Sequence, residues 1–363
     1  MSPHPDVLVL GGGVIGLTCA YFLAKEGVRV AVVDKSDFGQ EASWAGAGIL
    51  VPGSVEHART PGELLHAHGV AMFPTLSAEL RERTGIDNGY LRCGGLEIIP
   101  PDQPVTREWR GEGVASEMLD AKRLRRLEPM LTARAVDTVH YLPDMAQIRN
   151  PRHIKALLAG CAALEVDLIP NCPVTGFDRA GEKITGVRTC YQSLVAGRYI
   201  VAGGAWSDGL LDPLGVRLGI HPVRGQIAML NTRTRRIRHV LMLGKRYMVS
   251  RPDGRLLIGS TEENAGFEKQ TTAGAIAELL AFACQLVPDL ARAPLERCWA
   301  GLRPGSPDGL PFLGTVPGID NLFVAAGHFR SGIQMSPATG MLMKEVLMGQ
   351  RTMLPVEAFR VGR

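Results

Sequence analysis

The chain lacks the cysteine patterns of disulfide-rich and zinc-binding proteins. Its seven cysteines are odd in number and scattered over 363 residues, and no two of them form a Cys-x-x-Cys pair. We therefore expect a cytoplasmic protein in a reducing compartment, with no disulfide framework and no metal site.

An excess of charge of one sign is also missing. The net charge of +4 is too small for this length to indicate a nucleic-acid partner. Arginines recur at residues 123–126 and 233–238, but no aromatic residues alternate with them as they do in single-stranded nucleic-acid sites. We interpret both runs as solvated helix faces or strand ends, and we expect no nucleic-acid partner.

Long hydrophobic runs are scarce as well. The uncharged stretch at residues 7–24 is long enough to raise the question of a membrane span, but it contains three consecutive glycines and no Lys or Arg precedes it. We expect no membrane span. The hydrophobic fraction of 45% and the charged fraction of 21% are typical of a folded globular protein, and the length suggests two interleaved domains.

A glycine-rich segment near the N-terminus predicts a dinucleotide-binding βαβ unit. The apolar run at residues 7–10 suits a buried parallel strand, and the motif Gly-x-Gly-x-x-Gly follows directly at residues 11–16. Apolar residues then recur at helical spacing from Val14 to Glu26, and a second apolar run at residues 29–33 leads to Asp34. Together these features indicate a bound nucleotide, with a purely structural turn as the alternative.

The residue types in this motif suit a diphosphate. Gly11 permits the tight turn, Gly13 lets the backbone approach the pyrophosphate, and Gly16 lets the helix pack closely on the strand. The helix that starts at Val14 and Ile15 offers unpaired N–H groups and a partial positive charge to the phosphates.

The acid at the end of the second strand predicts a ribose contact but leaves the cofactor open. Asp34, followed by Lys35, can accept hydrogen bonds from the hydroxyl groups of an adenosine ribose. Because FAD and NAD both carry that ribose, the motif does not distinguish them.

Three further segments carry a resemblance to a known family. They are EASWAGAG at residues 41–48, GLRPGSPDGLP at residues 301–311 and GHFRSGIQ at residues 327–334. With the N-terminal motif, they resemble the glycine oxidase branch of the D-amino-acid oxidase superfamily. The resemblance implies an α/β (α+β) fold, in which an FAD-binding Rossmann-like βαβ domain is interleaved with an antiparallel-sheet substrate domain. We place the FAD-binding domain at residues 1–88, 145–219 and 300–363, and the substrate-binding domain at residues 89–144 and 220–299.

The same resemblance assigns FAD contacts beyond the glycine motif. Ser43 would lie near the diphosphate, and Ala47, Gly48 and Ile49 would lie along the isoalloxazine ring, where small residues let backbone pass close to a flat ligand. Val174 would contact adenine, although without the family it reads as a core strand residue. We expect non-covalent FAD. The predicted cofactor-binding residues are Gly11, Gly13, Val14, Ile15, Gly16, Asp34, Lys35, Ala42, Ser43, Ala47, Gly48, Ile49, Val174, Gly327, His328, Arg330, Ser331, Gly332, Ile333 and Gln334.

The segment before the last helix is a further candidate for flavin contact. Residues 321–326 read as an apolar strand, and Ser336 and Pro337 read as the N-cap and first residue of a final helix that extends to about Met348. Amides of residues 332–334 at the positive end of that helix would stabilise the negative charge of reduced flavin. A plain helix start is the alternative.

Three side chains are candidates for holding a substrate. Arg303 matches the family's carboxylate-binding arginine, and a guanidinium fork is the best partner for a planar carboxylate. Tyr247 matches a tyrosine whose hydroxyl helps to hold the same group, although its surroundings also fit a half-buried strand residue. Arg330 would lie on the flavin side of the pocket. We do not assign the neighbouring His328 as a catalytic base.

The reaction that the resemblance implies is oxidative deamination of glycine or another small amino acid. Hydride passes from the α-carbon to flavin N5, water hydrolyses the imine, and O2 reoxidises the flavin and yields hydrogen peroxide. The resemblance also suggests that the imine feeds thiazole synthesis for thiamine. The alternatives are a D-amino-acid or sarcosine oxidase or dehydrogenase, and a flavoprotein that acts on a modified tRNA side chain. A homo-oligomer is left open.

One segment departs from the family pattern. Where glycine oxidases typically carry Met after Gly-Ala-Thr, this chain has Gly-Ser-Thr-Glu-Glu at residues 259–263. A carboxylate of Glu262 near the pocket would favour a larger, cationic or more polar amino acid over glycine. If Glu262 faces solvent, it has no such effect, so the preferred amine is not determined.

Overall fold

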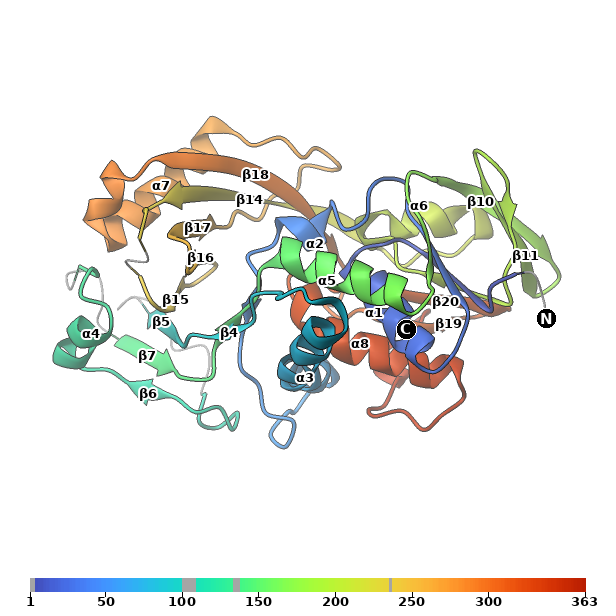
Figure 1. Cartoon of the computed structure of the whole chain (residues 1–363), viewed down its shortest axis with the longest axis horizontal. Coiled ribbons are helices and arrows are strands. Elements are labelled where there is room, and N and C mark those ends of the chain that lie inside the picture. Colours follow the sequence, from blue (N-terminus) through green and yellow to red (C-terminus); the bar gives the residue numbers. More distant parts are fainter. Residues whose placement is uncertain (1–3, 100–108, 133–137, 235–236) are drawn as a thin grey trace.

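Two large sheets organise the molecule, as a computed structural model shows (Figure 1). The structure describes residues 4–99, 109–132, 138–234 and 237–363. The mixed α/β architecture has the predicted fold class, with a six-stranded sheet and an eight-stranded sheet. Residues 100–108 and 133–137 of the predicted substrate domain lie outside the described residues.

The six-stranded sheet contains the predicted βαβ unit. Strands β1 and β2 pair in parallel with all eight of their residues buried, which is the pattern of a sheet covered on both faces. In spatial order the strands are β19 (Phe312–Val316), β20 (Ile319–Ala326), β13 (Arg198–Val201), β1 (Val7–Leu10), β2 (Val30–Val33) and β9 (Asp167–Ile169).

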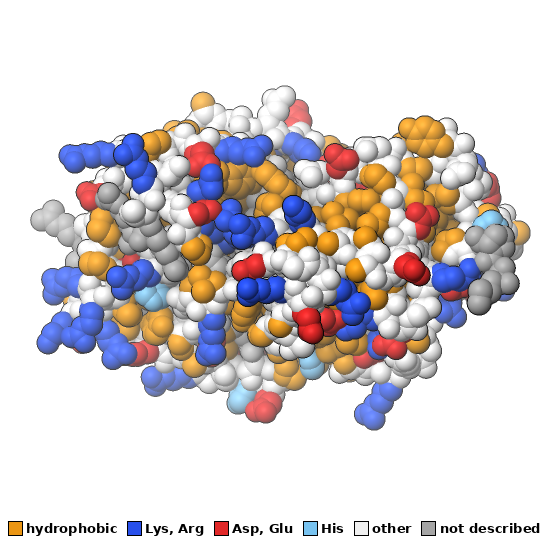
Figure 2. All heavy atoms as spheres, viewed as in Figure 1, with side chains coloured by type: hydrophobic (Ala, Val, Ile, Leu, Met, Phe, Trp, Pro, Cys, Tyr) orange, Lys and Arg blue, Asp and Glu red, His pale blue; other side chains and the backbone are white. Residues whose placement is uncertain are grey.

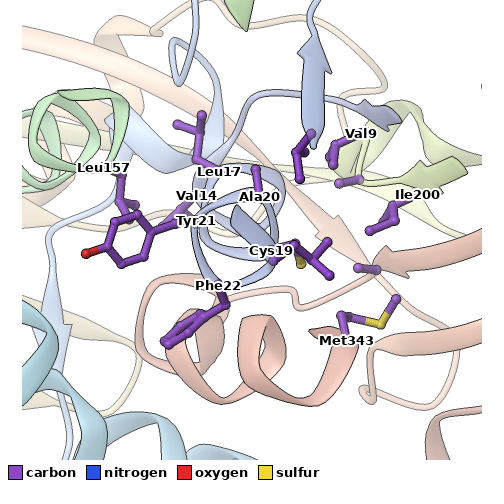
Figure 3. Close-up of a cluster of buried hydrophobic side chains, with 14 of the residues drawn as sticks. Val9, Val14, Leu17, Cys19, Ala20, Tyr21, Phe22, Leu157, Ile200 and Met343 are labelled. Carbon is purple, nitrogen blue, oxygen red and sulfur yellow. The ribbon is translucent and has the colours of Figure 1, made fainter. Parts of the chain in front are cut away.

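Alternation along β1 divides its side chains between two cores. Val9 faces a helical layer, where α1 residues such as Leu17 and Tyr21 pack with Leu157 and Met343 (Figure 3). Leu8 faces the opposite core, together with residues of a small antiparallel sheet. The helices of the first layer are α1 (Val14–Lys25), α3 (Pro61–Thr84), α5 (Asn150–Ala163) and α8 (Gly332–Leu347). The small sheet comprises β10 (Val174–Ala180), β11 (Lys183–Thr189) and β12 (Ser193–Leu194).

The eight-stranded sheet is mainly antiparallel, and α7 (Ala273–Leu286) packs on it through Leu279 and Phe282. In spatial order its strands are β18 (Leu295–Gly305), β14 (His221–Asn231), β17 (Arg255–Gly259), β16 (Arg246–Ser250), β15 (Val240–Leu243), β5 (Gly95–Ile99), β7 (Thr138–Leu142) and β6 (Glu117–Met118). The remaining elements are α2 (Ala42–Ala45), α4 (Ala121–Leu127), α6 (Ser207–Leu211), the sheet of β3 (Ile49–Leu50), β8 (Ala146–Gln147) and β4 (Leu91–Arg92), and the 3-10 helices η2 (Gly204–Trp206), η3 (Asp212–Leu214), η4 (Pro288–Arg292) and η5 (Glu357–Phe359).

Strands β14 and β18 link the two parts of the molecule. They are the longest strands of their sheet, each of 11 residues, and pair antiparallel from His221 opposite Gly305 to Leu230 opposite Leu295. In Figure 1 they run from the eight-stranded sheet toward the six-stranded one. The predicted domain boundary at residue 300 falls inside β18, because hydrogen bonding of this strand continues through Gly305. The division into domains stays a prediction.

The basic run at residues 123–126 lies on α4, with its three arginines exposed. Figure 2 shows Lys and Arg side chains at the left edge of this face, where Figure 1 places α4. Residues 235–236 of the other run lie outside the described residues. Within the described part of the chain, no helix is long and apolar enough to cross a membrane.

The predicted start of the last helix is wrong. Helix α8 begins at Gly332 with Ser331 as its N-cap, and Pro337 lies inside it. Proline lacks the N–H that would bond to the carbonyl of Ile333, four residues earlier. The hydroxyl of Ser336 donates to that carbonyl instead, at 2.8 Å, so the helix tolerates the proline.

Candidate active site

A cavity of about 660 Å³ is lined by residues from both large sheets. All predicted site residues except Gly16 line it, although they come from widely separated parts of the chain. Gly16 instead lies where α1 crosses β1, and a Cβ atom there would overlap the carbonyl of Gly11. This agrees with the predicted packing role of Gly16 and leaves it no direct ligand contact.

The glycine motif forms a cradle at the N-terminus of α1. Gly11 has a φ of 116°, and a side chain there would overlap the carbonyl of Ala202, the residue after β13. A Cβ atom on Gly13 would lie 3.2 Å from the hydroxyl of Ser43. That hydroxyl accepts from the first helical N–H, of Val14, at 2.9 Å. The first turn of α1 therefore combines close backbone access with N–H groups for an anion.

Asp34 is held in place by backbone groups. Its carboxylate accepts from the amide of Gly12 at 2.7 Å and from the amide of Ser36 at 3.0 Å. A carboxylate has further acceptor capacity, so Asp34 can still receive ribose hydroxyls. Beside it, Lys35 Nζ lies 3.3 Å from the ring centroid of Trp206, which also lines the cavity.

The backbone of residues 42–49 crosses the cavity and is tied down by two residues that the sequence did not indicate. The amide of Asn150 donates to the Ser43 carbonyl at 2.9 Å, and Arg251 donates to the Ala47 carbonyl at 2.7 Å. Gly48 adopts a φ of 68° against the carbonyl of Ile148. These contacts fix a stretch of small residues along one cavity wall.

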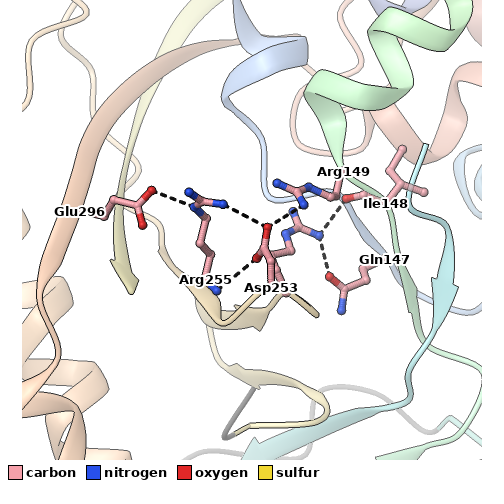
Figure 4. Close-up of polar contacts among 7 residues, drawn as sticks. Gln147, Ile148, Arg149, Asp253, Arg255 and Glu296 are labelled. Carbon is pink, nitrogen blue, oxygen red and sulfur yellow. Dashed lines mark hydrogen bonds and ion pairs between the residues drawn. The ribbon is translucent and has the colours of Figure 1, made fainter. Parts of the chain in front are cut away.

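Arg251 is a buried cation that anchors this wall. It is 4% exposed and donates to Gln147 at 2.6 Å and to the carbonyl of Ile148 at 2.9 Å. Burial lowers its pKa to about 10, so it stays protonated near neutral pH. Figure 4 shows Gln147 and Ile148 beside an ion-pair chain in which Asp253 lies between Arg149 and Arg255.

Arg303, on β18, is a largely buried cation among the residues that line the cavity. Its guanidinium donates to the hydroxyl of Ser260 at 2.7 Å and to the carbonyl of Thr261 at 3.1 Å. Burial lowers its pKa. Among the described residues no carboxylate forms an ion pair with Arg303, and a largely buried cation in that state is suited to an anionic ligand.

Tyr247 and Arg330 complete a group that we call the arginine corner: Tyr247, Ser260, Arg303 and Arg330. Tyr247 on β16 lies opposite Gly259 on β17, where a Cβ atom would lie 2.5 Å from the Tyr247 hydroxyl oxygen. Arg330 lies before α8, with Nη1 3.5 Å from Glu262. All four residues line the same cavity.

Glu262 neither points freely into the cavity nor faces only solvent. It pairs with Arg330 and, at 3.2 Å, with Lys245. Its charge is therefore directed to two cations of the chain, which leaves little of it to attract a cationic substrate.

His328 is buried within its loop. It is 3% exposed, its Nε2 lies 3.0 Å from the hydroxyl of Thr339, and burial lowers its pKa to about 3. The next amide, of Phe329, donates to the carbonyl of Pro304 at 2.9 Å. The loop is thus joined directly to the strand that carries Arg303.

Comparison with known proteins identifies the family. The model of a family described as FAD dependent oxidoreductase matches residues 6–346. The chain belongs to this FAD-dependent oxidoreductase family.

The chain is 35% identical to a glycine oxidase of Pseudomonas putida, over 95% of this chain and 94% of that protein. It is 32% identical to the bifunctional protein ThiO/ThiG of Synechocystis, over 100% of this chain and 54% of that protein. The crystal structure of glycine oxidase from Geobacillus kaustophilus matches with a TM-score of 0.92 and 32% identity, covering 100% of this chain and 99% of that one.

Family membership confirms the predicted resemblance and the FAD cofactor. The residues present fit FAD, because Gly11, Gly13 and Asp34 line one cavity that continues past residues 42–49 to Arg303. In the described part of the chain, no cluster of three potential metal ligands occurs. The roles of the individual site residues stay predictions.

Proposed function

We propose that this FAD-dependent oxidoreductase deaminates glycine or another small amino acid oxidatively, with O2 as electron acceptor and with ammonia, a 2-oxo acid and hydrogen peroxide as products. The observation that carries the proposal is the largely buried Arg303, which forms no ion pair with a described carboxylate and lines the same cavity as the glycine cradle. The likeness to glycine oxidases supports the choice of substrate.

The chain's own residues would act by binding and orientation. Arg303 and Tyr247 would hold the substrate carboxylate in the cavity that residues 47–49 also line. Non-covalently bound FAD supplies the two-electron oxidation of the carbon–nitrogen bond. The chemistry needs no nucleophilic side chain, so the site's task is to orient the substrate and exclude water.

A place in thiamine synthesis is part of the same proposal. The likeness to the protein named ThiO/ThiG supports an imine product that feeds this pathway. The seven cysteines are free in the structure, which fits a reducing compartment and the proposed cytoplasmic location.

Anaerobic titration of the purified yellow protein tests the substrate. Glycine should bleach the flavin absorbance, and hydrogen peroxide should appear when air is admitted. Bleaching by sarcosine or a D-amino acid but not by glycine would replace the proposed substrate with that amine. A flavin that no amino acid reduces would contradict the proposal.

A further inference from the structure

Two glycines lie directly opposite each other in the ladder of β14 and β18. Gly225 on β14 pairs with Gly301 on β18, and both residues line the cavity. The φ angle of neither lies in the left-handed region, so the backbone conformation does not require glycine at these positions. A glycine inside a strand often marks the close approach of another group, and here the structure shows which group approaches each of them.

The guanidinium of Arg303 fills the space beside Gly225. A Cβ atom at this glycine would overlap Cζ and Nη2 of the arginine and would lie 2.5 Å from its Nη1. Arg303 itself is opposite Val223 in the ladder, so its side chain leans two residues along β14 to reach Gly225. In this position Nη1 donates to the carbonyl of Thr261 at 3.1 Å, and Nη2 donates to the hydroxyl of Ser260 at 2.7 Å. The head group is therefore held between the bare backbone of β14 and two acceptors that follow β17.

Gly301 leaves room for a different neighbour. A Cβ atom there would lie 2.5 Å from the Cβ atom of Ala45 on α2, and α2 packs on β18. Ala45 belongs to the stretch of residues 42–49 that lines the cavity. One glycine of the pair thus accommodates the arginine head group, and the other accommodates the wall that we expect to face the flavin.

A glycine also lies beneath the second candidate carboxylate ligand. Gly259 on β17 is opposite Tyr247, and a Cβ atom there would lie 2.5 Å from the tyrosine hydroxyl oxygen. In the neighbouring strand, Gly259 is opposite Ile227, two residues from Gly225. Two adjacent strands therefore each carry a glycine at the place where a candidate carboxylate-binding side chain lies.

We propose that Gly225 is a positioning residue for the substrate carboxylate, because the absence of a side chain lets the Arg303 guanidinium lie against β14 within reach of both acceptors. This inference rests on the proposed carboxylate site at Arg303. A guanidinium has five N–H donors. Among the described residues, Thr261 and Ser260 accept two of them, which leaves three for a carboxylate that binds through both oxygens.

An alanine at position 225 would displace the arginine rather than the strand. The added methyl group would meet the end of a flexible side chain, and the backbone angle suits alanine. The guanidinium would have to move away from β14 and could no longer keep both of its hydrogen bonds. We therefore expect Gly225→Ala to retain the fold and FAD but to bind carboxylates weakly.

Acetate titration of the holoenzyme measures carboxylate binding separately from catalysis. Acetate in the cavity should perturb the flavin absorbance, whichever amine the enzyme oxidises. In Gly225→Ala the acetate Kd should rise about tenfold, because hydrogen bonds to a charged group lose their alignment. The KM of the oxidised amine should rise more than kcat falls, and the FAD content should stay that of the wild type.

A double variant tests whether the effect passes through the arginine. Gly225→Ala should lower the free energy of unfolding in urea, because the methyl group and the guanidinium compete for one space. In the Arg303→Ala background that space is empty, so the same glycine change should cost no stability. If Gly225→Ala alone is too unstable to purify, the double variant should still fold. A double variant that does not fold would overturn the inference, because the methyl group would then meet something other than the guanidinium.

Two other glycines provide the controls. Gly274→Ala adds a methyl group in open space on α7 and should leave the acetate Kd unchanged. Gly301→Ala adds one against α2 and should lower the FAD affinity, which Gly225→Ala should not do. This contrast separates a specific effect on Arg303 from a general need for glycine in the ladder.

Three further outcomes would overturn the inference. Acetate that binds Gly225→Ala within twofold of the wild type would remove Gly225 as a positioning residue and leave the proposed function intact. Equal loss of FAD from Gly225→Ala and Gly301→Ala would show that both glycines serve the fold alone. If acetate leaves the wild-type flavin spectrum unchanged at any concentration, the carboxylate site itself is wrong, and the role of Gly225 falls with it.

Discussion

The two walls of the cavity are assembled in different ways. The wall of the six-stranded sheet takes most of its lining from residues between 10 and 51, many of them small. The arginine corner draws its four side chains from β16, the residue after β17, β18 and the loop before α8. One wall is therefore local in sequence and made of small residues, whereas the other depends on strand register and on long side chains.

We expect this difference to separate cofactor binding from substrate binding. A change in the arginine corner should alter the substrate step and leave FAD in place, while a change in the glycine cradle should do the reverse. Each of the following experiments tests how cleanly the two walls separate.

The largest effect is expected for Arg303→Ala. Breaking a buried arginine–carboxylate pair costs about 3–5 kcal/mol, so kcat/KM should fall several hundredfold or more while the FAD content stays that of the wild type. Arg152→Ala removes an exposed arginine of α5 and should change neither quantity. Unchanged kinetics would remove Arg303 from the site, and loss of FAD would show that the walls are not separable.

A smaller effect is expected for Gly13→Ala. The added methyl would lie 3.2 Å from the Ser43 hydroxyl, at the mouth of α1, without a forbidden backbone angle. Overpacking of this kind costs about 1–3 kcal/mol, so FAD affinity should fall roughly ten- to a hundredfold, as measured by fluorescence titration of the apoprotein. Gly274→Ala, with open space around it in α7, is the control, and equal FAD affinity in both variants would contradict the cradle.

Two buried histidines predict an acid-sensitive fold. Burial lowers the pKa of His153 to about 4 and that of His328 to about 3, whereas both titrate near 6.5 in the unfolded chain. Between these values only the unfolded state binds the protons. The free energy of unfolding therefore decreases as the pH falls below 6.5, by up to about 1.4 kcal/mol per pH unit for each histidine.

Urea unfolding at pH 7, 6 and 5 measures this loss. His153→Gln should reduce the slope, and His221→Ala, at an exposed position, should leave it unchanged. A free energy of unfolding that is constant between pH 7 and pH 5 would mean that the imidazoles take up protons in the folded protein.

The smallest effect is expected where residues of the loop between β17 and α7 meet the nucleotide-binding wall. The ring of Phe267 packs 5.3 Å from Trp206, and Lys269 pairs with Glu41 at 2.8 Å. Both partners line the cavity. Because these contacts are exposed, removing both side chains should speed FAD release only a few-fold, seen as flavin fluorescence after dilution. An unchanged release rate would show that this loop does not help to retain FAD.

The two walls also differ in how far the sequence predicts them. The residues of β1, α1 and β2 and the roles of Gly11 and Gly16 follow from local patterns, and the structure places these elements within one residue of their predicted ends. The sequence did not indicate Ser260 or Arg251 as site residues, because their hydrogen-bond partners depend on which strands lie side by side. The predicted start of α8 was wrong because a Ser-Pro pair looks the same in the sequence whether it begins a helix or lies inside one.

The shared ladder of β14 and β18 constrains how this enzyme can be taken apart. A fragment that ended at the predicted boundary near residue 300 would cut β18 in mid-strand. The amides and carbonyls of β14 that pair with the missing part would then be unpaired. Neither half should be recovered as a stable protein by itself. A chimaera with a relative should exchange both strands together. If β14 came from one protein and β18 from the other, the pairing of Val223 with Arg303 would join two strands that did not evolve together.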